Sequence, residues 1–365
     1  METAGFYHAY LKNLKPRLEF DPTMSAQAMD VWREKVREKL QDLLDFPEVG
    51  STPEPKRLWE KPREGYRLEK WEAYPEPYCV VPFYILVPDG VNADSPGPTV
   101  MCFSGYSASK ENLAGEPEEG ADEIGTTRKW LDNRMGYHYV RAGLVAVVFD
   151  SPGTHETESA LCTRNNFALH GLWMGRSYES VSTFQKAHVL HWLAEQAWVD
   201  ANRIAVSGHS LGAKPADILG VLYPDLVKAV VHNDFVLNWQ ERIVAMNLYE
   251  PPGHQMIPGI FQWFDYPDLE SALAPTPLLF TEGGRPNQYA KIQRAYELEK
   301  APHQVELHHC DQYKDPASRK LDEVPLPEGL DYDEYFKYAY VNVSEHRFRH
   351  WHAVPWLRKV FGMPA

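Results

Sequence analysis

The chain is poor in features that mark whole classes of protein. Only four of its 365 residues are cysteines (Cys79, Cys102, Cys162 and Cys310), and their spacing matches no metal or redox motif. It has no run of about 18 apolar residues, so we expect no membrane-spanning helix and no membrane partner. Basic residues are also few, 37 against 51 acidic ones, and the net charge of -14 argues against nucleic acid as a partner.

The N-terminus lacks the basic stretch and the apolar stretch of a signal peptide. It reads METAGFYH, which mixes acidic, polar and aromatic residues. Together with the scattered cysteines, this favours a cytoplasmic protein with reduced thiols. Cys102 lies in an apolar stretch and is expected to act as a small core residue.

The chain does have enough apolar residues, 44% of the total, for a sizeable core. Continuous apolar stretches that predict buried strands alternate with stretches that predict helices. The expected strands are residues 99–103, 144–149, 204–206, 227–231, 277–280 and 304–308, and the expected helices between them are 127–142, 177–195 and 287–300. This alternation predicts the α/β class, with a mostly parallel central sheet flanked by helices.

Other segments stand outside this alternation. Residues 25–46 have the apolar spacing of an amphipathic helix, so we expect a helical extension over 1–64 and a catalytic domain over 65–365. Residues 235–274 and 311–342 are long and rich in aromatics, which is typical of lids over a binding site. In the first of these lids, the aromatic residues Trp239, Trp263 and Phe264 are candidates for the substrate pocket.

The motif with the clearest chemistry is G-x-S-x-G, within the stretch RIAVSGHSLG at 203–212. An apolar strand leads into it and a helical pattern follows it, which predicts a nucleophile elbow. Gly208 and Gly212 would leave room for the tight bend, and Ser210 would be presented as the nucleophile. The backbone N–H of Leu211 would lie at a helix N-terminus, where it can stabilise an oxyanion.

In the order of its motifs, the chain resembles the dienelactone-hydrolase and acetyl-xylan-esterase branch of the α/β-hydrolase superfamily. The resemblance covers about residues 66–361. It depends on the stretches at 103–106, 149–153, 175–177, 199–212 and 345–348. It implies an α/β-hydrolase fold with an N-terminal helical extension and lid insertions.

The resemblance also implies the partners of Ser210. His346, in a His-x-Phe motif before the last predicted helix, is expected as the base, with His308 and His309 as rivals. The position where the family usually has an aspartate holds Asn287, so the acid is Glu282 or, alternatively, Asp234. The first choice is Glu282, at the end of its strand.

Three further residues receive expected roles. The backbone N–H of Tyr106, in the loop after the first core strand, is the candidate for the second oxyanion donor. By family analogy Arg176 braces loops near the substrate pocket. Lys214 either pairs with a carboxylate such as Asp217 or contacts an anionic substrate.

These residues predict a serine hydrolase that cleaves a carboxylic ester through an acyl-enzyme. The resemblance favours a small acyl group on a carbohydrate or on an aryl or alkyl alcohol. The chemistry requires no cofactor or metal, and the expected partner is a small ester. A peptidase, an acyltransferase and a non-catalytic binding protein on the same fold stay open, as does a homo-oligomer.

Overall fold

The structure is a computed structural model that describes residues 3–118, 123–247 and 253–364. The described residues form two compact units, each assembled from separate stretches of the chain. Unit 1 contains residues 1–43, 234–252 and 257–346. Unit 2 contains residues 44–233, 253–256 and 347–365.

Unit 2 contains a twisted sheet in the order β1-β2-β3-β5-β4-β6-β7. The pairs β1-β2, β2-β3 and β3-β5 are antiparallel. The pairs β5-β4, β4-β6 and β6-β7 are parallel. The strands are β1 Lys56–Arg63, β2 Tyr66–Ala73, β3 Val81–Pro88, β4 Gly97–Phe103, β5 Val145–Phe149, β6 Val199–His209 and β7 Val227–Asn233. Strands β3, β4 and β5 are buried along their whole length, as their continuous apolar sequences predict.

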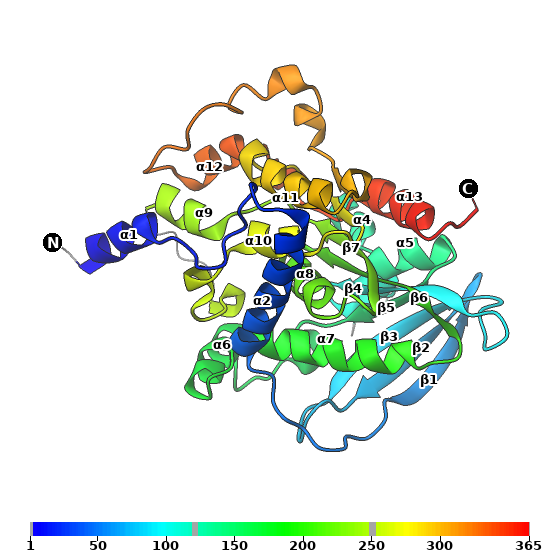
Figure 1. Cartoon of the computed structure of the whole chain (residues 1–365). Coiled ribbons are helices and arrows are strands. Elements are labelled where there is room, and N and C mark those ends of the chain that lie inside the picture. Colours follow the sequence, from blue (N-terminus) through cyan, green and yellow to red (C-terminus); the bar gives the residue numbers. More distant parts are fainter. Residues whose placement is uncertain (1–2, 119–122, 248–252, 365) are drawn as a thin grey trace. The chain divides into compact units, whose positions relative to one another are not determined.

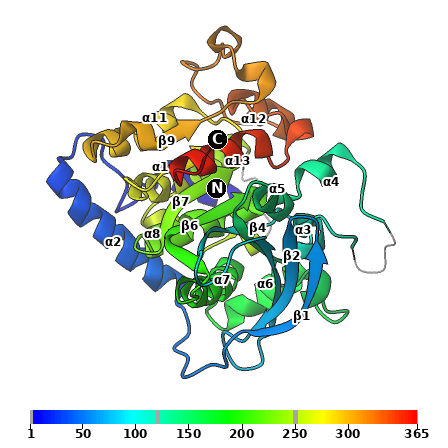
Figure 2. The same cartoon turned by 90° about the vertical axis from the view of Figure 1, so that its right-hand side faces the viewer.

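Helices cover both faces of this sheet. Helix α8 packs on strands β6 and β7 and helix α7 packs on β6 from one side, while α5 and α13 lie on the other (Figure 2). The helices of the unit are α3 Lys110–Ala114, α4 Arg128–Asp132, α5 Met135–Arg141, α6 Arg164–Trp173, α7 Tyr178–Ala194, α8 Ala213–Leu222 and α13 His350–Val360. The helix expected over 127–142 is interrupted between α4 and α5, where Asn133 ends the first helix.

Unit 1 contains the parallel strand pair β8 Leu278–Phe280 and β9 Val305–Leu307. Its helices are α1 Thr3–Asn13, most of α2 Ala26–Leu44, α9 Trp239–Ala245, α10 Tyr266–Ala272, α11 Pro286–Leu298 and α12 Tyr332–Tyr338, all labelled in Figure 1 or 2. Helix α2 confirms the amphipathic helix expected over 25–46, because Met29, Val36 and Leu40 on its apolar face are fully buried.

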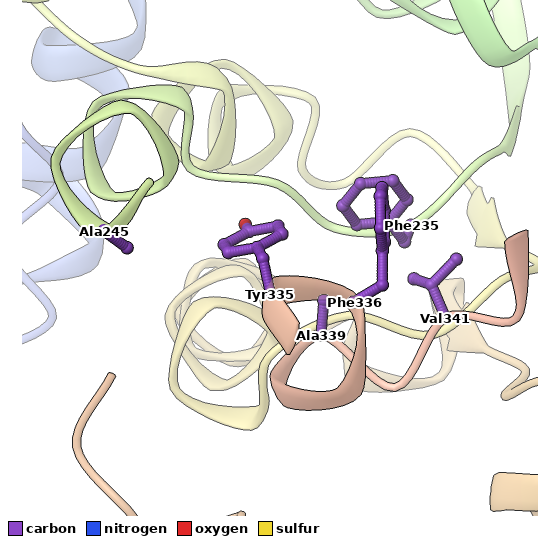
Figure 3. Close-up of a cluster of buried hydrophobic side chains, with 6 residues drawn as sticks. All are labelled: Phe235, Ala245, Tyr335, Phe336, Ala339 and Val341. Atoms are coloured by element: carbon purple, nitrogen blue, oxygen red, sulfur yellow. The ribbon is translucent and has the colours of Figure 1, made fainter. Parts of the chain in front are cut away.

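The two stretches expected as lids pack against each other inside unit 1. Phe235 and Ala245 from the first stretch meet Tyr335, Phe336, Ala339 and Val341 from the second in one apolar cluster (Figure 3). The rings of Phe235 and Phe336 meet edge to face with centroids 5.5 Å apart. Residues 248–252 of the first stretch, including Tyr249, lie outside the described residues. The role of both stretches as lids, and the domain boundary at 64/65, stay predictions.

Two expectations from the composition are met. All four cysteines carry free thiols, and Cys102 is fully buried among strands, where burial raises the pKa of its thiol. Among the described residues, no helix is both long enough and apolar enough to cross a bilayer.

Candidate active site

Strand β6, the short 3-10 turn Ser210–Gly212 and helix α8 form the expected elbow in unit 2. Ser210 has a φ of 54°, in the left-handed region that residues with a side chain rarely adopt. A Cβ built on Gly208 would lie 2.1 Å from the carbonyl oxygen of Gly212, and one on Gly212 would lie 2.3 Å from that of Phe103. Both positions therefore require glycine, and the bend they permit holds Ser210 in a strained backbone conformation that is typical of functional sites.

The loop after β4 lies directly against this elbow. A Cβ built on Gly105 would lie 2.9 Å from the imidazole of His209 and 3.4 Å from the Cβ of Ser210. Tyr106 follows in the chain, with about half of its side chain exposed. The loop is thus in the place where an oxyanion donor is expected, and its glycine permits the close approach.

In unit 1, the structure brings Glu282 and His346 together. The Nδ1 atom of His346 lies 2.6 Å from a carboxylate oxygen of Glu282. Glu282 is fully buried, while the His346 side chain is about a quarter exposed. A buried carboxylate at Nδ1 orients the imidazole and stabilises its protonated form, which leaves Nε2 as the atom for proton transfer.

Two glycines shape the turn that carries Glu282. Gly283 and Gly284 both have positive φ, and a Cβ on Gly284 would lie 2.7 Å from the side chain of Val236. The N–H of Val236 donates to the carbonyl oxygen of Gly283 at 2.9 Å, and the N–H of Gly283 donates to that of His308 at 2.9 Å. The turn is therefore hydrogen-bonded to the segments of Val236 and His308, which fixes the position of the Glu282 carboxylate.

The rival acid and the rival bases have other contacts. The Asp234 carboxylate accepts the N–H of Phe235 at 2.9 Å, and Asn287 lies exposed in the first turn of α11. His308 lies 3.8 Å from Glu306, and His309 packs edge-on against Tyr340. The geometry thus favours Glu282 over Asp234 as the partner of His346.

The residues expected in the substrate pocket have varied surroundings. Phe264 is fully buried, Trp239 is nearly so, and the Trp263 ring lies under the cations of Arg17 and Lys39. Arg176 pairs with Glu76 at 2.7 Å and lines a cavity of about 460 Å³ in unit 2. The assignment of all four to a substrate pocket stays a prediction.

A group of polar residues that was not expected from the sequence lies beside Tyr106. Arg164, at the start of α6, donates from Nη2 to the Tyr106 carbonyl oxygen at 2.6 Å, and the Tyr106 ring packs on His254 with centroids 5.3 Å apart. The carboxylate of Asp217, which was expected as a possible partner of Lys214, lies 2.8 Å from Nδ1 of His232. The Lys214 Nζ donates to the Gln255 carbonyl oxygen at 3.0 Å. Neither α6 nor residues 253–256 carries a motif that could have indicated these contacts.

Comparisons with known proteins found a matching family and similar structures. The Abhydrolase family matches the chain over residues 1–359. A crystal structure from Bacteroides fragilis, provisionally described as an acetyl xylan esterase, has 33% sequence identity to this chain and a TM-score of 0.91. The match covers 99% of this chain and 95% of that one. A comparison with curated proteins found no match.

More distant structures share the fold at lower identity. A methylesterase has a TM-score of 0.59 at 17% identity, over 98% of this chain and 79% of that one. A glucuronoyl esterase from Solibacter usitatus has a TM-score of 0.55 at 13% identity, over 78% and 86%. The expected α/β-hydrolase fold is confirmed, while the dienelactone-hydrolase branch stays a prediction. The family match over nearly the whole length, together with the parallel strands and the elbow, shows that the chain belongs to the Abhydrolase family.

Proposed function

We propose that this protein is a serine esterase that cleaves a carboxylic ester through an acyl-enzyme. The observation that carries the proposal is Ser210 at a strained turn between β6 and α8, flanked by two positions that accept only glycine. The pair of His346 and Glu282 supports it, because a serine hydroxyl needs a base, and the base needs an orienting acid.

In the proposed reaction, the Oγ of Ser210 attacks the ester carbonyl and His346 takes its proton. The backbone N–H groups of Leu211 and Tyr106 stabilise the oxyanion, and Glu282 stabilises the imidazolium that forms. The alcohol leaves with the proton from His346. Water, activated by the same histidine, then attacks the acyl-enzyme, releases the acid and restores Ser210.

We further propose a small acyl group such as acetyl, carried by a carbohydrate or by an aryl or alkyl alcohol. The support is the description of the Bacteroides fragilis relative, together with the resemblance in the sequence. The free thiols of all four cysteines are in keeping with the cytoplasmic location expected from the sequence.

The first test compares the purified protein with a Ser210→Ala variant on 4-nitrophenyl esters of increasing acyl length. We expect turnover by the wild type that falls by at least about 10³-fold in the variant, because the nucleophile is lost. A fluorophosphonate probe should label the wild type and not the variant. Absence of both turnover and labelling in the wild type would overturn the proposal in favour of a binding protein.

A further inference from the structure

A cluster of nitrogen-bearing side chains lies beside the nucleophile in unit 2. The Tyr106 ring contacts the guanidinium of Arg164, 4.2 Å from the ring centroid, and the imidazole of His254, whose centroid is 5.3 Å away. His254 comes from the short turn Gly253–Gln255, and the Nζ of Lys214 donates to Gln255 in the same turn. Since the loop of Tyr106 lies against Ser210, this cluster borders the position of the ester.

Polar atoms of the cluster lack partners. His254 is fully buried, and its Nε2 has no hydrogen-bond partner among the described residues, while its Nδ1 lies 3.2 Å from Oδ1 of Asn165. The Nε and Nη1 atoms of Arg164 are also buried and, within the described part of the chain, unpartnered. Buried nitrogens are nearly always hydrogen-bonded, so three such atoms in one cluster point to a ligand that completes them.

The charge of the cluster indicates the kind of ligand. Burial, Arg164 and Lys214 lower the pKa of His254 to about 4, so the cations at neutral pH are Arg164 and Lys214. The charged group that faces Lys214 from α7 is Glu179, whose pKa burial raises to about 7, which weakens its ability to balance that cation. The phenol of Tyr178, the other titratable neighbour, has a pKa raised by burial and stays neutral.

We propose that Arg164 and His254 form a subsite for a carboxylate of the ester substrate, beside Ser210. A carboxylate oxygen accepts from the free N–H groups of the Arg164 guanidinium, the charge-assisted pairing that arginine favours. His254 binds the same group through Nε2 as the imidazolium that the bound anion stabilises, because its Nδ1 already donates to Oδ1 of Asn165. The inference rests on the proposed esterase function and narrows its substrates to esters that carry a negative charge.

The test compares charged and neutral esters in the full-length protein. One pair places the charge on the acyl side, mono-4-nitrophenyl adipate against 4-nitrophenyl hexanoate. The other places it on the alcohol side, 4-carboxyphenyl acetate against phenyl acetate. Each ester is measured with the wild type, Arg164→Gln, Arg164→Lys and the control Arg203→Gln. The control removes one charge from the start of β6, where Arg203 pairs with Asp200.

We expect Arg164→Gln to lower kcat/KM for the charged ester of at least one pair by about tenfold more than for its neutral partner. Arg164→Lys should retain part of the preference, and Arg203→Gln should leave it unchanged. An equal loss for charged and neutral esters in both pairs would overturn the inference, because Arg164 would then only position the Tyr106 loop.

Binding is measured separately by calorimetric titration of benzoate, with benzamide as the neutral control. Benzoate that binds the wild type and not Arg164→Gln supports the subsite, even if none of the four esters is hydrolysed. In that case the proposed function fails and the subsite stands. Equal binding of benzoate and benzamide, or binding that Arg164→Gln does not weaken, would overturn the subsite, whatever the esterase activity.

Discussion

Glu282 and Asp234 lie on two adjacent segments of unit 1, and their carboxylates differ in what they contact. The backbone N–H of Glu282 donates to the Asp234 carbonyl oxygen at 3.2 Å, so the two backbones are adjacent. The Glu282 carboxylate lies 2.6 Å from Nδ1 of His346, whereas the Asp234 carboxylate accepts the N–H of Phe235 at 2.9 Å. These contacts make Glu282 the candidate triad acid, while Asp234 accepts a hydrogen bond from its own loop.

This difference predicts the outcome of a pair of matched substitutions. We expect Glu282→Gln to lower kcat for ester hydrolysis by about 10³- to 10⁴-fold, because an amide cannot stabilise the imidazolium. Asp234→Asn should change kcat less than about tenfold, since the amide oxygen can still accept the N–H of Phe235. The reverse ranking in steady-state kinetics would assign the acid to Asp234.

Among elements, the strand-turn-helix around Ser210 depends most on side-chain size. A Cβ on Gly208 would lie within 2.6 Å of three backbone atoms of Gly212 and Ala213, which cannot move aside as a flexible side chain would. We expect Gly208→Ala to lower the free energy of unfolding by at least about 3 kcal/mol and to abolish esterase activity. Gly50→Ala, where a Cβ meets nothing within 4 Å, is the control and should change stability little. Chemical denaturation measures the free energy of unfolding of both variants, and an equal value for the two would contradict the steric argument.

Asp265 caps the N-terminus of helix α10, and its buried carboxylate accepts the N–H groups of Tyr266 and Gln240. Burial raises its pKa to about 6, so the folded protein binds a proton that the unfolded chain releases near pH 4. Its contribution to stability is therefore greatest below pH 4 and is lost as the pH rises through 6, by about 3 kcal/mol.

The expected consequence is a changed pH dependence in Asp265→Asn. The amide has no proton to lose, so the variant should gain stability relative to the wild type between pH 4 and 7, whatever the cost of the lost acceptor at low pH. Denaturation curves at several pH values measure the difference. A constant difference across this range would show that Asp265 is ionised throughout.

At the scale of the whole molecule, the two units differ in how their cores are made. The core of unit 2 is built on the sheet of β1 to β7, whereas unit 1 is held partly by the cluster around Phe336. Arg242 lies 5.2 Å from the centroid of that ring, which adds a cation–π contact. We expect Phe336→Ala to cost about 3–5 kcal/mol through the cavity it leaves.

Hydrogen exchange measures which part of the chain loses stability in Phe336→Ala. Protection should fall first in α9 and α12, which supply the cluster, and only later in β4 to β6 of unit 2. An equal fall in both units at once would mean that they unfold as one cooperative body.

Much of the fold could be predicted from the sequence, with errors of a few residues at the ends of elements. The strand ending at Phe149 and the helix over α7 follow from apolar runs and their spacing, which are local properties. Strand β1 was missed, because Lys56–Arg63 is charged and contains Pro62, which is typical of an edge strand. The break between α4 and α5 was missed because a local pattern does not show tertiary contacts such as that of Asn133, whose side chain accepts the N–H of Phe348 at 2.7 Å.

Local patterns also predicted the elbow, and the demand for glycine at position 208 is local, since it comes from the backbone of Gly212 and Ala213. At position 212 the demand comes from the backbone of Phe103 and depends on the tertiary structure. Only the tertiary structure decided that Glu282, 64 residues away along the chain, meets His346. It also decided that the side chains of Arg164 and His254 contact the ring of Tyr106. Such contacts depend on how distant segments pack, and neither periodicity nor a short motif records that information.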